Sequence, residues 1–229
     1  MSNSSYADSS VAVERKSRGS YFFANKMGRI FYLALEEAAG RESIRAILRS
    51  ARMQNRLDTY PPNDFAAEFS FDELGRIQQT MDELYGPRTG RRLARRTGRA
   101  CFRIGVEDLH LVLGVADLLF RILPLQMRIR IGFEVLAQVF DRFSDQVVHL
   151  EEDERYFRWV IEPCGVCWER DTAAPCCDLV VGLLEEALYW LSGGAGFFIE
   201  ESSCIATGDS TCTILIGKQP LVGGVSPGD

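Results

Sequence analysis

The sequence predicts an α+β fold in which an antiparallel β-sheet packs against a layer of helices. Residues 21–143 carry apolar side chains at the three- and four-residue spacing that is typical of amphipathic helices. Residues 146–217 instead contain short runs rich in Val, Ile, Phe, Tyr and Trp, separated by turn residues, with one more helix among them. Helices followed by paired strands favour the α+β class.

The helical part divides at its capping residues, glycines and prolines. Gly40 ends the first helix, and Ser70 with Glu73 forms a capping box at the start of the third. Pro124 separates the last two, because proline cannot continue a preceding helix. Helices are therefore expected over residues 21–39, 44–53, 71–84, 88–104, 109–123 and 125–143.

The segment 88–104 carries a stripe of arginines at helical spacing. Its simplest interpretation is a solvated helix face that pairs with acidic neighbours. The alternative is a site for a phosphate, a carboxylate or a partner, since the arginine fork suits such anions. The arginines are Arg88, Arg91, Arg92, Arg95, Arg96, Arg99 and Arg103.

The second part alternates strands with one helix. An acidic run over residues 151–154 separates the first two strands, which predicts a hairpin, and Gly208-Asp209 is a turn between the last two. Gly193 ends the intervening helix. Strands are expected over residues 146–150, 156–162, 197–206 and 211–217, and a helix over 177–191.

Composition bounds the organisation and the partners. We expect one domain over residues 21–221, a disordered tail over 1–20 and a flexible tail over 222–229, with 46% apolar residues supplying the core. The formal charge of −6 and the lack of a nucleic-acid-binding motif argue against nucleic acid as a partner. The longest apolar run is interrupted by charges, so no transmembrane segment is expected, and without an export signal we expect a cytoplasmic protein.

Seven cysteines without an export signal favour free thiols or metal ligation over disulfides. Cys177 precedes a helix, and a hairpin would place Cys204 beside Cys212 with Glu201 nearby, so these four could close a tetrahedron around zinc. The alternative is a set of buried, inert cysteines. Cys164 and Cys167 form a separate CxxC pair that could serve a second metal, a redox couple or an iron–sulfur site.

The run from Cys177 to Gly194, followed by Glu201-Ser-Ser-Cys204 and, seven residues later, Cys212, resembles the 4-vinyl-reductase domain. That family is similar to the sensory domain of phenol-responsive activators and, more distantly, to TRAPP subunits. The resemblance covers residues 21–221. It implies a structural zinc on Cys177, Glu201, Cys204 and Cys212 beside an apolar ligand pocket, in a homodimer.

The first functional hypothesis is therefore a binding domain for a hydrophobic or aromatic small molecule, acting as a carrier, sensor or accessory protein. The pocket candidates are Phe133, Phe140, Phe157, Trp159 and Tyr189, which could equally be plain core residues.

The alternative function is an enzyme or enzyme accessory that reduces a tetrapyrrole vinyl group in bacteriochlorophyll synthesis. No dinucleotide or flavin motif supports it, and His110 and His149 are the two histidines of the chain. A third possibility is a dimeric scaffold with a collapsed pocket.

Overall fold

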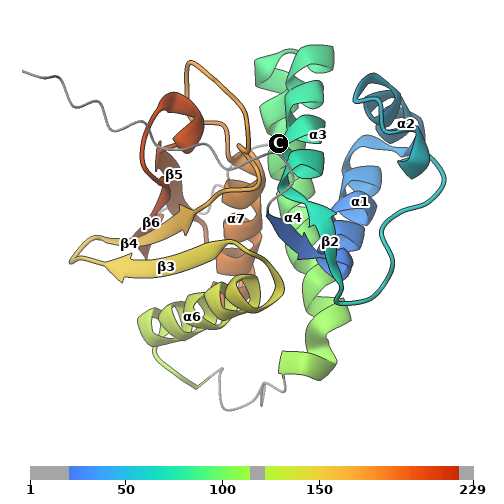
Figure 1. Cartoon of the computed structure of the whole chain (residues 1–229). Coiled ribbons are helices and arrows are strands. Elements are labelled where there is room, and N and C mark those ends of the chain that lie inside the picture. The colour runs from blue at the N-terminus through green and yellow to red at the C-terminus, as the bar shows by residue number, and fades with distance from the viewer. Residues whose placement is uncertain (1–20, 114–121, 222–229) are drawn as a thin grey trace, which may run out of the picture.

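The computed structural model describes residues 21–113 and 122–221, in which helices cover one face of a four-stranded antiparallel sheet (Figure 1). This confirms the predicted α+β class. The helices are α1 (Asn25–Ala39), α2 (Arg41–Ser50), α3 (Phe71–Tyr85), α4 (Pro87–Leu113), α6 (Leu125–Phe143) and α7 (Asp178–Ser192). The strands are β1 (Phe22–Ala24), β2 (Ala67–Ser70), β3 (Val147–Glu152), β4 (Tyr156–Glu162), β5 (Phe197–Ser203) and β6 (Cys212–Pro220).

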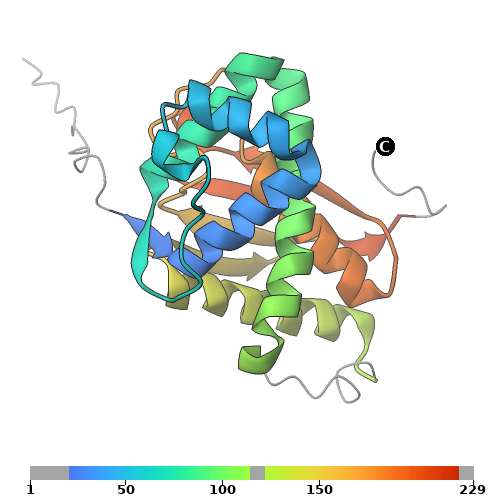
Figure 2. The same ribbon diagram turned by 90° about the vertical axis from the view of Figure 1, so that its right-hand side faces the viewer.

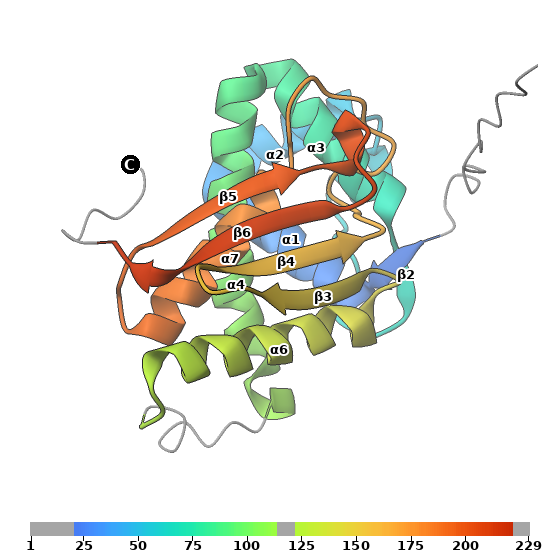
Figure 3. The ribbon, with the colours of Figure 1, turned by 90° about the vertical axis from the view of Figure 1, so that its left-hand side faces the viewer.

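The four-stranded sheet has the order β3-β4-β6-β5, and both predicted hairpins are part of it (Figure 3). Along β4 the side chains alternate between buried and partly exposed, as expected for a sheet with one covered face. Trp159 pairs with Ile214 of β6, and both are fully buried. Helices α6 and α7 supply apolar side chains that cover this face.

A small second sheet was not predicted. Strands β1 and β2 pair antiparallel, so the helix expected over residues 21–39 begins at Asn25 instead. The side chain of Asn25 is buried and donates to Asp64 and Glu68, which fixes the turn from β1 into α1. These hydrogen bonds to a distant part of the chain override the helical spacing of the residues before Asn25.

Helix α4 is longer than the segment 88–104 predicted for it, because it continues to Leu113. The next expected helix, over residues 109–123, lies mostly outside the described residues, as do the tails 1–20 and 222–229. Figure 2 shows α1 in blue and α4 in green lying over the strands. In the part of the chain that the structure describes, no helix is long and apolar enough to cross a bilayer.

Helices α4 and α7 form the most extensive contact between two elements. Glycines allow it: a Cβ on Gly98 would lie 2.0 Å from the carbonyl oxygen of Leu179, and one on Gly182 would lie 1.9 Å from that of Arg95. Any side chain at either position would force the helices apart.

Arg91, Arg95, Arg99 and Arg103 of the arginine stripe pair with acidic side chains, as the simpler interpretation expected for these four. Arg95 and Arg99 both bind Glu185, whose side chain is 6% exposed. Arg91 binds Asp178 at the first turn of α7, with 2.6 Å between Nε and Oδ2. These pairs fix the position of α7, whose first turn adjoins the cysteines described next.

Candidate metal centre and internal cavity

Six cysteines converge where the loop after β4, the start of α7 and the β5–β6 connection meet. All six are free thiols and buried, whereas the seventh, Cys101, is partly buried elsewhere on α4. The loop after β4 supplies two of them, the residues before α7 supply two, and the connection and start of β6 supply the rest. The six are Cys164, Cys167, Cys176, Cys177, Cys204 and Cys212.

The structure brings the four predicted metal ligands together. One ligand atom from each of Cys177, Glu201, Cys204 and Cys212 lies within 4.8 Å of all the others. The Sγ atom of Cys204 is 3.9 Å from those of Cys177 and Cys212. The backbone N–H of Cys177 donates to Oε2 of Glu201 at 2.7 Å, while Oε1 is buried and has no hydrogen-bond partner. A buried carboxylate oxygen left in this state is costly, and a metal ion would satisfy it.

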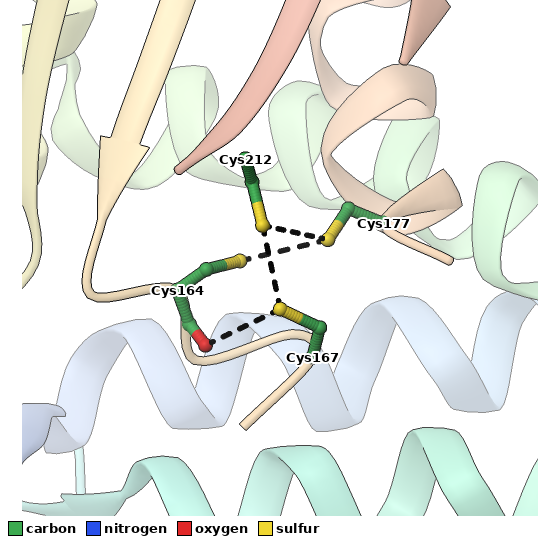
Figure 4. A group of neighbouring side chains, drawn as sticks. All are labelled: Cys164, Cys167, Cys177 and Cys212. Atoms are coloured by element: carbon green, nitrogen blue, oxygen red, sulfur yellow. Dashed lines mark hydrogen bonds between the residues drawn. The ribbon is translucent and has the colours of Figure 1, made fainter. Parts of the chain in front are cut away.

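Cys164 and Cys167, predicted as a separate pair, belong to the same cluster. Their Sγ atoms lie with those of Cys177 and Cys212 in a second group, again within 4.8 Å of one another (Figure 4). The Cys164–Cys177 distance is 3.6 Å and the Cys167–Cys212 distance is 3.4 Å. The sequence left open whether they join the site, because the loop between β4 and α7 has no periodic pattern from which its return to the sheet could be predicted.

Burial and mutual hydrogen bonding set the electrostatics of the cluster. Burial raises the pKa of Glu201 to about 8. Hydrogen bonds from neighbouring cysteine thiols lower the pKa of Cys204 and also that of Cys164, which favours the thiolate form of both. The backbone N–H of Ile205 donates to Sγ of Cys212 at 3.3 Å. Thiolates with such support are the form of cysteine that binds metals.

A separate, partly open cavity of about 300 Å³ lies between α1, α4, α6 and α7. Its wall is almost wholly apolar, with the amide of Gln146, the thiol of Cys101 and the indole N–H of Trp190 as the polar side-chain groups among the described lining residues. Gly105 of α4 leaves part of this space open, since a Cβ there would meet no atom within 4 Å. Other lining residues are Met27, Ile30, Phe31, Phe102, Val106, Val135, Leu136, Phe140, Leu183, Ala187 and Trp190.

The cavity and the cysteine cluster share a wall. Val166, which lies between Cys164 and Cys167 in the loop, lines the cavity. So do Leu179 and Val180 in the first turn of α7, directly after Cys177.

The structure places the five predicted pocket residues differently from one another. Phe140 lines the cavity. Phe133, Phe157 and Trp159 are fully buried and pack edge to face between α6 and the sheet, so they are core residues outside the lining. Tyr189 is 53% exposed on α7. The five residues were chosen because they lie on segments near the cysteines. This criterion did not identify the pocket, because the sheet face packs on α6 while the cavity opens towards α1 and α4.

Comparisons of the whole chain find H-NOX proteins among solved structures. No protein-family model matches, and no curated protein does. A Cs H-NOX variant matches with a TM-score of 0.56 at 15% identity, covering 86% of this chain and 98% of that one. The S. oneidensis H-NOX in its Fe(II)NO ligation state matches at 0.54 and 13% identity, covering 86% and 99%. A structure described as probing haem distortion in the H-NOX family matches at 0.53 and 15% identity, covering 89% and 99%. The chain thus has the H-NOX fold.

These comparisons correct the family prediction. The resemblance to 4-vinyl-reductase domains, phenol sensors and TRAPP subunits rested on one cysteine motif, whereas the matched H-NOX structures cover most of the chain. Three predictions followed from that resemblance and were wrong. They are the structural zinc, the carrier stabilised by zinc, and the role in bacteriochlorophyll synthesis. The matched structures are described by haem and its iron ligands instead.

Proposed function

We propose that this chain is a ligand-sensing domain with the H-NOX fold, whose cavity receives a compact, uncharged and largely apolar molecule. The main support is the lining of the cavity, which contains no charged side chain among the described residues. A charged ligand would be buried there without a counter-ion, at a cost of several kcal/mol. The fold supports a sensory role, since one matched structure concerns the mechanism of H-NOX activation.

The described lining supplies few groups for haem, with which the matched H-NOX proteins are described. Haem iron takes an axial His, Cys thiolate, Met or Tyr. The donors in the described lining are Met27 and Cys101, and burial raises the pKa of Cys101 to about 12, so its thiol stays protonated. His149 lies in β3 with an exposed side chain, and the side chain of His110 lies outside the described residues. The described lining also offers no cation for the propionates.

The test is a pair of titrations of the purified full chain, one with uncharged monocyclic aromatics and one with haem. The aromatics should raise the melting temperature progressively as their concentration increases. Gly105→Leu should abolish that shift because its side chain fills the open part of the cavity, while the exposed Glu107→Leu on the same helix should retain it. Stoichiometric haem binding with a sharp Soret band, and no response to the aromatics, would refute the proposal.

We also propose that Cys177, Glu201, Cys204 and Cys212 hold a thiophilic metal ion. Support comes from the convergence of their ligand atoms and from the unpaired buried oxygen of Glu201. Elemental analysis of the purified chain should find bound metal, and Cys204→Ser should lose it. Cys101→Ser, on α4 outside the cluster, is the matched control. Metal-free protein of unchanged stability would contradict this assignment.

The homodimer and the cytoplasmic location remain predictions. Six buried free thiols support a reducing compartment. Sedimentation velocity over a range of concentrations tests the dimer.

A further inference from the structure

The geometry points to a dinuclear metal centre, in which two ions share the thiolates of Cys177 and Cys212. This inference rests on the proposed metal binding at Cys177, Glu201, Cys204 and Cys212, and it adds a second ion held by Cys164 and Cys167. Each ion would then have four ligands: two of its own and the two that are shared.

The sulfur distances match this arrangement. A tetrahedral ion with metal–sulfur bonds of about 2.3 Å places its ligands about 3.8 Å apart. The shared pair, Cys177 and Cys212, is separated by 3.7 Å. The other recorded Sγ–Sγ distances within the two groups run from 3.4 Å to 3.9 Å. Two tetrahedra that share one edge therefore account for the positions of all five sulfurs.

A single ion leaves donors unused. An ion between Cys164, Cys167, Cys177 and Cys212 leaves the buried Oε1 of Glu201 without a partner. An ion in the other group leaves Cys164 and Cys167 as two buried thiols aimed at a filled site (Figure 4). Cys177 and Cys212 belong to both groups, so full use of the donors requires that they bridge.

Charge is also balanced by two ions. Five thiolates and one carboxylate in a buried site need compensation, and two divalent ions supply most of it. Two arginines lie near the remaining negative charge, each also paired with a carboxylate: Arg91 with Asp178, and the buried Arg170 with Asp82. Arg91 interacts electrostatically with Glu201 and Cys176, and Arg170 donates to the carbonyl oxygen of Cys176. Cys177 also lies at the start of α7, where the helix dipole favours a thiolate.

Cys176 provides a control that distinguishes a metal ligand from a cysteine that only lies nearby. Its Sγ lies 3.9 Å from that of Cys204, yet it belongs to neither group of four. Cys176→Ser is therefore a matched control that removes a buried thiol beside the centre without removing a ligand.

Native mass spectrometry of the purified full chain, with cadmium exchanged into the centre, tests the inference. The wild type and Cys176→Ser should carry two ions. Cys164→Ser and Glu201→Gln should each carry one, and Cys177→Ser should lose affinity for both. Cadmium-113 NMR should show two resonances in the wild type, coupled to each other through the shared sulfurs. Circular dichroism of each variant identifies those that fail to fold, and the NMR coupling in the wild type needs no variant at all.

The outcomes distinguish the two proposals. One ion per chain, retained in Cys164→Ser, would overturn the dinuclear centre and leave the proposed metal site standing. No bound ion would overturn both. Acid-labile sulfide in the native protein would also overturn the inference, since an iron–sulfur cluster bridges its irons with inorganic sulfide and not with cysteine.

Discussion

Replacing Gly182 with alanine should separate α4 from α7 and destabilise the protein strongly. The new Cβ would lie 1.9 Å from the carbonyl oxygen of Arg95, about 1.1 Å short of the 3.0 Å that real Cβ contacts observe. Backbone lies on both sides of the contact, so neither helix can yield by rotating a side chain. We expect a loss near the upper end of the range for overpacking, about 3 kcal/mol, or roughly 6–12 °C in melting temperature.

Urea unfolding followed by far-ultraviolet circular dichroism measures this loss. Gly105→Ala is the matched control, because it lies in α4, its Cβ would meet no atom within 4 Å, and alanine in a helix gains about 1 kcal/mol over glycine. Gly98→Ala, whose Cβ would lie 2.0 Å from the carbonyl oxygen of Leu179, should cost about as much as Gly182→Ala. The double variant should lose less free energy of unfolding than the sum of the two single variants, because one movement of α4 away from α7 accommodates both methyl groups. A Gly182→Ala protein as stable as the wild type would show that the close approach is not required.

Two further predictions concern charged groups. Glu185→Gln should lower the free energy of unfolding by about 2 kcal/mol, less than for a fully buried pair because its partners Arg95 and Arg99 are 35% and 25% exposed; an unchanged urea midpoint would contradict this. Backbone N–H groups of Arg155 and Tyr156 lower the pKa of Asp153 below its usual 3.8, so its stabilisation is present above pH 3.8 and is lost as the pH falls through the lower folded-state pKa. Asp153→Asn should therefore show a shallower loss of stability in acid below pH 3.8, and equal slopes would refute the assignment.

The regular elements could be predicted because each carries its own local signal. The capping box at Ser70 and Glu73 is present, with the N–H of Glu73 donating to Oγ of Ser70. The richness of residues 156–162 in Val, Phe, Tyr and Trp likewise predicted the strand β4. β1 and β2 lacked such a signal, since strands of three and four residues are too short for a period to be counted.

The site was predicted only in part, because its remaining members are fixed by tertiary structure. Cys204 and Cys212 lie near each other in sequence and flank a turn, so their meeting followed from a hairpin. Cys164 reaches the cluster through a loop whose path depends on α3 and on packing against Phe23 and Phe71, which surround Gly165. The cavity depends on gaps between four helices, to which Gly105 contributes. Such a gap arises only when the helices pack together, so the sequence of one helix cannot predict it.

Val166 lies between Cys164 and Cys167 and also lines the cavity, so the two proposed sites would share this residue. Whatever metal binding does to the position of this loop changes the free energy of filling the cavity, and the reverse change is equal by necessity. A tenfold gain in ligand affinity on metal loading would equal a tenfold gain in metal affinity on ligand binding, or about 1.4 kcal/mol in each direction. Under the two proposals, the supply of thiophilic metal would then set the ligand concentration at which the cavity fills.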